Sequence, residues 1–271
     1  MSESNGTDLI SRFSIEALVA SRDAVVESFR ESARRISEAV NTGEEWSLHL
    51  PSLRTDQGVY LLDNKEGDLD SRIVLNIDQA YWRALMQRSG IRDIMSASAM
   101  KDLDSTVSSE KCPELTAAHI RATFHGLSAR REGMFSDFLI SIYKHICWDR
   151  KTNQPAQFGE RMILHRCQSY WSKDRPTIEY NSVVVELERA LATLAGNPVP
   201  TFDTSVQRAV KGVAFGEWFS APGENPTFSI KLFKNGNGHL RVKRNLIDEM
   251  NRIVAASYQN ALPWAKGSKA S

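Results

Sequence analysis

The side chains best suited to chemistry gather near residue 239. His239 closely follows Lys234 and Asn237 in the run Lys-Asn-Gly-Asn-Gly-His. An imidazole can act as a general acid or base, while an ammonium group and an amide can hold a phosphate or a developing negative charge. His125 and Arg131, from a helix expected earlier in the chain, are further candidates. One hypothesis is therefore a nuclease-like reaction, with these five residues as candidate catalytic groups.

The same segment also has a structural interpretation. The Asn-Gly pair at 235–236 lies between two alternating stretches, 228–233 and 240–243, and such a pair is a strong β-hairpin signal. Matching apolar residues across the hairpin pairs Leu232 with Leu240, which requires a three-residue turn or a bulge. The opposite face then carries a polar and basic set: Ser229, Lys231, Phe233, His239, Arg241 and Lys243.

Charge is unevenly distributed along the chain, although the formal net charge is only +1. Residues 205–271 hold 10 Lys+Arg against 4 Asp+Glu, whereas residues 1–110 hold 12 against 19. A basic segment of this kind is typical of a surface that binds a polyanion. We therefore predict DNA or RNA as the partner, with phosphate contacts and stacking by six hairpin residues: Lys231, Phe233, Lys234, His239, Arg241 and Lys243.

Motifs for other reactions are absent from the sequence. It contains no G-x-G-x-x-G, P-loop, H-E-x-x-H or G-x-S-x-G pattern. Two His-x-Cys pairs, His145 with Cys147 and His165 with Cys167, offer potential zinc ligands. Paired zinc ligands usually leave about two to four residues between them, and residues two apart on a helix point in different directions. We predict no metal site and no cofactor.

Hydrophobic periodicity predicts the helices of the first half. A helix over 14–40, with Ser14 as its N-cap, has an apolar stripe that is expected to pack on the rest of the chain. A homodimer through this helix is the alternative. Two shorter helices are predicted over 78–89 and 91–103, and a weak hairpin over 46–70.

A long helix over 116–146 is predicted in the centre of the chain. Gly126 and Gly133 weaken it, because each costs about 1 kcal/mol relative to Ala in a helix interior. We expect a kink there, or the close approach of another segment. The remaining predicted elements are a strand over 161–165 and helices over 181–194 and 246–258.

These elements predict an α+β fold that is rich in helix. It has a long N-terminal helix, a long central helix and a small antiparallel sheet that includes the C-terminal hairpin, followed by a helix. The predicted organisation is a disordered tail (1–12), an N-terminal helix with a weak hairpin (13–75), a main α+β domain (76–262) and a flexible tail (263–271).

Composition excludes several classes of protein. With 41% hydrophobic and 25% charged residues, the chain has the composition of a globular protein. No stretch approaches the roughly 20 apolar residues needed to cross a bilayer, so no membrane association is expected. Three cysteines are an odd number at low density, which favours a reducing compartment. The expected location is the cytoplasm.

Several segments together resemble a known family. They are Met134-Phe135, residues 148–153, residues 158–164 and, most specifically, the run Phe-Lys-Asn-Gly-Asn-Gly-His-Leu at 233–240. The pattern resembles an uncharacterised domain family of bacterial mobile elements, prophages and plasmids, whose members stand alone or are fused to adenine-N6 DNA methyltransferases. The resemblance spans about 78–262. It implies a mobile-element or phage-defence context, with a methyltransferase or toxin–antitoxin partner, and it implies no reaction.

Three functional hypotheses follow. The first is an accessory protein of a mobile element that binds nucleic acid through the basic face of the hairpin. The second is a nuclease-like toxin or effector that uses His239 with Lys234 and Asn237. The third is a protein–protein interaction module. The segment Asn-Pro-Val-Pro at 197–200 departs from the N-P-P-[YF] motif of the methyltransferases, so S-adenosylmethionine binding is not expected.

Overall fold

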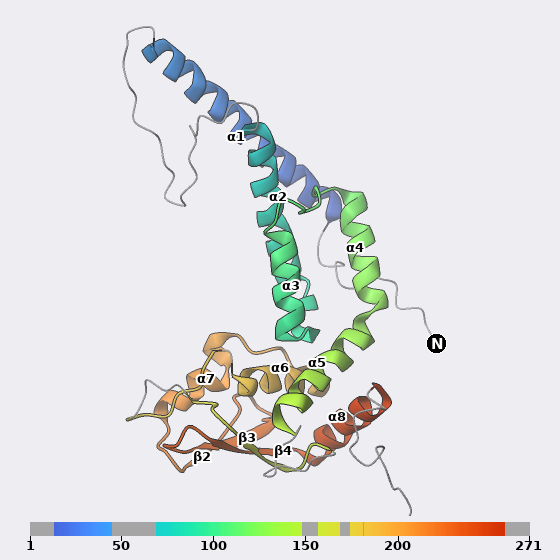
Figure 1. Cartoon of the computed structure of the whole chain (residues 1–271), viewed down its shortest axis with the longest axis vertical. Helices are drawn as coiled ribbons and strands as arrows, with labels where there is room; N and C mark the ends of the chain where they lie inside the picture. The colour runs from blue at the N-terminus through green and yellow to red at the C-terminus, as the bar shows by residue number, and fades with distance from the viewer. Residues whose placement is uncertain (1–13, 45–68, 148–156, 169–173, 181, 258–271) are drawn as a thin grey trace, which may run out of the picture. The chain divides into compact units, whose positions relative to one another are not determined.

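The chain forms an α+β fold in which α-helices predominate, as predicted, with one small antiparallel sheet (Figure 1). It divides into two compact units, of which the first comprises residues 1–90 and 101–129 and the second residues 91–100 and 130–271. The predicted division at residue 75 stays a prediction. The computed structural model describes residues 14–44, 69–147, 157–168, 174–180 and 182–257.

The first unit is built around two long helices that pack against each other, α1 (Ile15–Glu44) and α2 (Leu69–Arg88). The predicted start of α1 is confirmed, because the Ser14 hydroxyl accepts a hydrogen bond from the Ala17 N–H at 3.1 Å. Val26, in the predicted stripe, is buried against α2. Part of the stripe is therefore covered within the chain, and the homodimer through α1 stays a prediction.

The helices predicted over 78–89 and 91–103 have other bounds in the structure. α2 begins at Leu69, because Ile73 and Ile77 are buried against α1 and so extend the helix toward its N-terminus. The second prediction covers a 3₁₀ turn, η1 (Ile91–Ile94), and a separate helix, α3 (Ala97–Val107). Ser96 causes the separation, since its hydroxyl accepts the Ala99 N–H at 3.2 Å and caps α3.

The prediction of one long central helix over 116–146 is wrong. The structure has two helices, α4 (Ala117–Ala129) and α5 (Arg131–Ile146), separated at Arg130 with φ −102° and ψ 4°. The break lies between Gly126 and Gly133 and at neither of them. No atom lies within 4 Å of a Cβ built on either glycine, so the expected close approach is absent among the described residues. The break coincides with the boundary between the two units, and each helix packs into a different core.

The second unit places helices on one face of the sheet (Figure 1). α6 (Val183–Ala195) and α8 (Arg244–Ser257) pack against α5. They confirm the helices predicted over 181–194 and 246–258. Ser182 caps the start of α6, and Gly196, at φ +68°, ends it. A short helix, α7 (Val206–Ala209), and the 3₁₀ turns η2 (Phe202–Thr204) and η3 (Val210–Gly212) precede the C-terminal strands.

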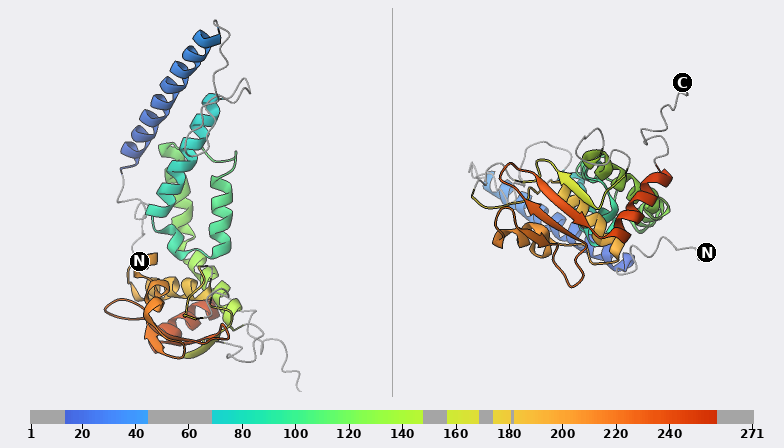
Figure 2. Two further views of the ribbon diagram at one scale, coloured as in Figure 1. Left: turned by 90° about the vertical axis from the view of Figure 1, so that its left-hand side faces the viewer. Right: turned by 90° about the horizontal axis from the view of Figure 1, so that it is seen from below.

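The sheet has four antiparallel strands in the order β1-β4-β3-β2. The predicted hairpin is confirmed as β3 (Phe228–Leu232) and β4 (Gly238–Val242), and the predicted strand over 161–165 as β1 (Arg161–Leu164). β2 (Trp218–Ser220) is an additional strand. Both hairpin strands are therefore central, and the hairpin is not a free ribbon (Figure 2). A ligand that contacts the side chains of the hairpin must therefore approach a face of the sheet.

The predicted register of the hairpin is wrong by two residues. Leu232 pairs with Gly238, and Leu240 pairs with Ile230. A Cβ on Gly238 would lie 2.9 Å from the Cys167 sulfur, so this core-facing position has no room for a side chain. Pairing apolar with apolar residues cannot anticipate a glycine in the core. A slip of two residues keeps each side chain on its predicted face.

The hairpin turn has three residues, Lys234 to Gly236, which is the first of the two predicted alternatives, shifted by the change of register. The Phe233 N–H donates to the Asn237 carbonyl at 2.9 Å, and the Gly236 N–H donates to the Phe233 carbonyl at 3.0 Å. Gly236 has φ +85°, in the left-handed region that favours glycine. Asn235 accepts the Asn237 N–H at 3.1 Å, which is the local role that turns give to asparagine.

Several predictions lie outside the described residues: the weak hairpin over 46–70, apart from its last two residues at the start of α2, and the two tails, 1–12 and 263–271. Among the helices that the structure describes, none combines the length and the apolar character needed to span a bilayer.

Candidate functional site

The face of the sheet opposite the helices is open to solvent. Strand alternation places every second residue on this face, while Phe228, Ile230, Leu232, Leu240 and Val242 are buried on the other. Antiparallel pairing then aligns side chains across the strands. One row is Trp218, Lys231, His239 and Ile163, and the next row is Ser220, Ser229, Arg241 and Arg161. We call these residues, together with Phe233, the open face.

Four residues of the predicted nucleic-acid-binding set come together on the open face. Lys231 is directly opposite His239 in the β3–β4 pair, and Arg241 lies one row away. The Phe233 and His239 rings are 4.6 Å apart between centroids, tilted by 59°. The predicted basic residues Lys231, His239 and Arg241 therefore lie together on one face of the sheet.

Two aromatic rings contact two of the cations of the open face. The Arg241 guanidinium carbon lies 4.2 Å from the centre of the Trp218 ring, and the Lys231 ammonium lies 5.3 Å from it. The same ammonium lies 5.9 Å from the centre of the Phe233 ring. These distances are those of cation–π contacts. Trp218 nonetheless keeps 36% of its surface exposed.

The charge of the open face is not neutralised by the residues that the structure describes. No salt bridge involves Arg161, Lys231 or Arg241 within that part of the chain. Neighbouring carboxylates are engaged elsewhere. Glu160 pairs with Arg244 at 2.8 Å, and Glu217 accepts the Ala214 N–H at 3.3 Å.

Three other predicted residues lie at the ends of the hairpin. Lys243 follows β4, and its ammonium donates a hydrogen bond to the Asn225 side chain, so it is already engaged. Lys234 is exposed in the turn, and Asn237 is half-buried where the turn closes. Of these three, only Lys234 offers an exposed cation that the described residues leave unpaired.

In the described part of the second unit, no side-chain hydrogen bond joins the residues proposed for catalysis to one another. The His239 side chain has no hydrogen-bond partner in the described part of the chain, and its ring contacts Phe233 instead. His125 lies on α4 in the first unit, whereas Arg131 begins α5 in the second. A general acid or base must lie within hydrogen-bond reach of the group whose proton it transfers. For His239 only a bound substrate could provide such a group, since no described side chain does.

The two cysteines of the His-x-Cys pairs are both fully buried. Cys147 donates to the Gln157 carbonyl at 3.6 Å, and Cys167 donates to the Gly236 carbonyl at the same distance. Burial raises the pKa of each thiol to about 12. Within the described ranges, no three His, Cys, Asp or Glu side chains are placed to hold a metal ion.

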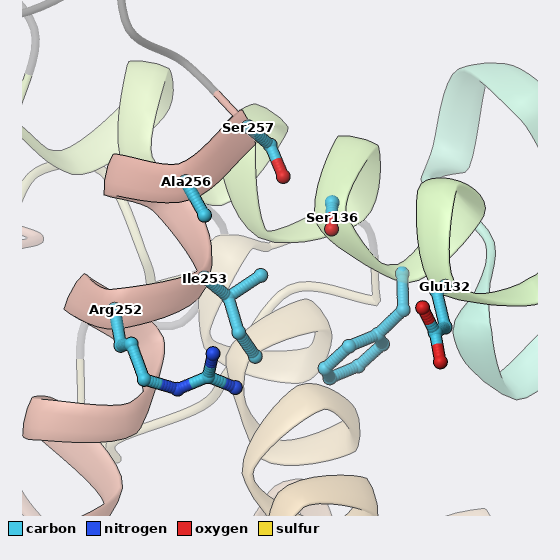
Figure 3. Close-up of a pocket in the computed structure, with 7 residues that line it drawn as sticks. Glu132, Ser136, Arg252, Ile253, Ala256 and Ser257 are labelled. Atoms are coloured by element: carbon cyan, nitrogen blue, oxygen red, sulfur yellow. The ribbon is translucent and has the colours of Figure 1, made fainter. Parts of the chain in front are cut away.

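A cavity of about 500 Å³ lies between α5 and α8. Figure 3 shows Glu132 and Ser136 on one wall and Arg252 and Ile253 on the other. Arg252 is already paired with Glu249, at 2.6 Å. The cavity therefore offers no free cation to an anionic ligand.

A second cavity, of about 690 Å³, lies beside the β2–β3 connection, with Glu188, Asp203 and Glu224 among the residues that line it. The carboxylates of Asp203 and Glu224 would repel phosphate. Asn225, which also lines it, accepts the hydrogen bond from Lys243.

The prediction from sequence missed the four residues that β1 and β2 contribute to the open face, of which Arg161 and Trp218 could bind a ligand by charge or by stacking. Arg161 lies in the predicted strand over 161–165, but only the pairing of β1 with β4 places it opposite Arg241. Trp218 lies in a strand of three residues, and its alternation with Phe219 and Ser220 is too short to identify a strand. Both positions depend on long-range pairing.

The structure thus defines a two-unit α+β protein with an open, cationic and aromatic sheet face. The chain belongs to a domain family of unknown function, DUF4942, whose model matches residues 74–260. The match covers the whole sheet, α5 to α8 and most of α2. It confirms the predicted resemblance to an uncharacterised family. Comparison with curated proteins and with solved structures found no match.

Proposed function

We propose that this protein binds nucleic acid through the open face of its sheet. The observation that carries the proposal is the group of Arg161, Lys231 and Arg241 on one exposed surface, with no acidic partner among the described residues. Arg161 and Arg241 are directly opposite across β1 and β4. Like charges in that position destabilise a sheet, and a bound phosphate would relieve the repulsion.

The aromatic rings favour nucleic acid over other polyanions. The cations of the open face would attract any polyanion. Trp218 and Phe233 add stacking surfaces beside them, and phosphate contacts combined with stacking are how many proteins bind nucleic acid. The basic C-terminal segment, 10 Lys+Arg against 4 Asp+Glu over 205–271, supports the same partner.

The proposed context is an accessory role in the cytoplasm, within a mobile genetic element or a phage-defence system. The resemblance of the run at 233–240 supports this context, including a methyltransferase or toxin–antitoxin partner. Cys112, Cys147 and Cys167 are free thiols in the structure, which is consistent with a reducing compartment.

Binding is expected to weaken steeply with salt. Each phosphate that a cation neutralises contributes about 0.7 to 0.9 log units of affinity for each log unit of salt. Replacing Arg161 and Arg241 together by Gln removes two such cations, so the slope is expected to flatten by about 1.4 to 1.8. Fluorescence anisotropy with a labelled oligonucleotide, titrated at several salt concentrations, measures both slopes.

The matched control is Arg208→Gln with Lys211→Gln, which removes two exposed charges of the second unit that do not lie on the open face. This variant is expected to keep nearly the wild-type slope. Equal slopes for wild type and the Arg161/Arg241 variant, or no binding by the wild type, would contradict the proposal.

Retention without cleavage is the expected result when the protein is incubated with labelled DNA and RNA in magnesium. His239 has no described partner to assist proton transfer. His239→Ala is therefore expected to reduce affinity modestly and to change no turnover. A nuclease would instead show cleavage by the wild type that falls about 10²- to 10⁴-fold in His239→Ala, and that outcome would establish the alternative.

A further inference from the structure

We infer that the open face takes single-stranded nucleic acid, with unpaired bases stacked on Trp218 and Phe233. The inference rests on the proposed function and names its substrate class. Three observations on the described residues carry it: the width of the sheet, the positions of the two rings, and the positions of the cations near them.

The width of the sheet disfavours a duplex groove. Four strands have three spacings of about 4.8 Å, so the backbone of the sheet is about 14 Å wide before side chains are added. The major groove of B-DNA is about 12 Å wide and admits a helix or a two-stranded ribbon. The hairpin cannot enter as a ribbon, because β1 and β2 flank it on both sides. A duplex could meet this face only through its backbone.

The two rings are placed for adjacent bases. Trp218 lies in β2 and Phe233 directly follows β3, the neighbouring strand, one row further along the sheet. The Lys231 ammonium lies near both, 5.3 Å from one ring centre and 5.9 Å from the other. A duplex hides the faces of its bases in its own stack, whereas a single strand can offer them to aromatic rings.

The cations lie where a single strand would need them. Lys231 lies near both rings, Arg241 lies beside Trp218, and Arg161 is on the edge strand β1. Stacked bases would therefore run with their phosphates over a line of positive charge. This combination of stacking platforms and a basic track binds single strands with little dependence on sequence.

The test compares wild type with Trp218→Leu and Phe233→Leu, which keep apolar bulk but remove the ring. Mixed-sequence DNA and RNA oligonucleotides are used as single strands and as the annealed duplexes, in anisotropy titrations at one salt concentration. The wild type is expected to bind single strands at least about 10-fold tighter than duplex. Each ring deletion is expected to weaken single-strand binding about 5- to 100-fold, with little change in duplex binding.

Phe202→Leu is the matched control. Phe202 is an exposed aromatic residue of the same unit, with the Lys211 ammonium 5.3 Å from its ring centre, and it does not lie on the open face. Its replacement is expected to leave affinity unchanged. Circular dichroism melts of all three variants identify any loss that comes from unfolding, and Trp218→Phe, which keeps a smaller ring, is expected to restore part of the affinity if stacking is responsible.

The two proposals fail in different ways. Duplex binding equal to or tighter than single-strand binding, or unchanged single-strand affinity in both ring variants, overturns the single-strand inference. If Arg161→Gln with Arg241→Gln still weakens binding in that case, the proposed function stands. Absence of binding to every oligonucleotide overturns both.

Discussion

Replacing Asp78 by Asn is expected to lower the free energy of unfolding of the first unit by about 3 to 5 kcal/mol. Asp78 on α2 is 2% exposed and forms a bidentate pair with Arg22 on α1, at 2.7 and 3.0 Å. The hydrogen bonds that Arg22 donates to Asp78 raise the pKa of the Arg22 guanidinium above its ordinary value, so Arg22 stays charged. Asn cannot neutralise that charge, and the variant leaves Arg22 with only its exposed partners, Asp23 and Glu114.

Asp23→Asn provides the control on the same guanidinium. Asp23 also pairs with Arg22, at 2.9 Å, but its side chain is 58% exposed. Its loss is expected to cost no more than about 1 kcal/mol, because solvent screens exposed pairs. Urea denaturation measures the free energy, and hydrogen exchange at the amides of α1 and α2 assigns the change to the first unit.

A double replacement distinguishes the penalty of an unpaired charge from the value of the pair. Arg22→Leu with Asp78→Leu removes both charges, and it is expected to recover most of the loss. The expectation is wrong if Asp78→Asn costs no more than Asp23→Asn. It is also wrong if the double variant is less stable than Asp78→Asn alone.

Local signals in the sequence predict the elements that depend on nearby residues. Ser14 caps α1, Ser182 and Gly196 bound α6, and the Asn-Gly pair at 235–236 forms the hairpin turn. In each case the hydrogen-bond partner is within about five residues, or the backbone conformation is one that a single residue type favours. Such features can be identified without knowledge of the tertiary structure.

The predictions that are wrong concern features that depend on residues far away in the sequence. The break at Arg130 and the early start of α2 depend on which core each helix joins, and the central helix has an uninterrupted apolar pattern that predicts one element. The hairpin register depends on Cys167, 61 or more residues away from β3 and β4 in the sequence. Long-range packing overrides local propensity at these positions.

The candidate site was predictable to the extent that it lies on one hairpin. Alternation alone places Lys231, His239 and Arg241 on one face, because a register error of two residues preserves the faces. Arg161 and Trp218 come from the edge strands, and no local pattern assigns edge strands to a hairpin. The cations were therefore partly predictable from the sequence, whereas the position of Trp218 beside them could be found only from the structure.

The stability of the second unit is expected to fall as pH rises from 5 to 8, because of Glu188. This side chain on α6 is 3% exposed, and its Oε1 accepts the Val206 N–H at 2.8 Å. Burial raises the pKa of Glu188 from its ordinary value of 4.5 to about 7, although the hydrogen bond from Val206 offsets part of the shift. The folded protein therefore binds this proton between pH 4.5 and 7, where the unfolded chain has released it.

The direction in which stability changes with pH follows from that difference in bound protons. A carboxyl group with a raised pKa stabilises the fold at pH values below its unfolded pKa, and the contribution is lost as pH rises through the folded pKa. One pKa unit corresponds to about 1.36 kcal/mol, so the loss between pH 5 and pH 8 is about 2 to 3 kcal/mol. The Glu188 carboxylate, once ionised, stays buried with a single described hydrogen bond.

Glu188→Gln isolates this contribution, because glutamine is neutral throughout and its carbonyl can still accept the Val206 N–H. The variant is expected to gain about 2 to 3 kcal/mol relative to wild type when the comparison moves from pH 5 to pH 8. Urea denaturation at both pH values measures the change, and other titrating groups cancel in the comparison. Glu224→Gln, an exposed carboxylate on the same cavity, is expected to give no such gain. Parallel stability curves for wild type and Glu188→Gln between pH 5 and 8 would show that Glu188 is ionised in the folded protein throughout this range.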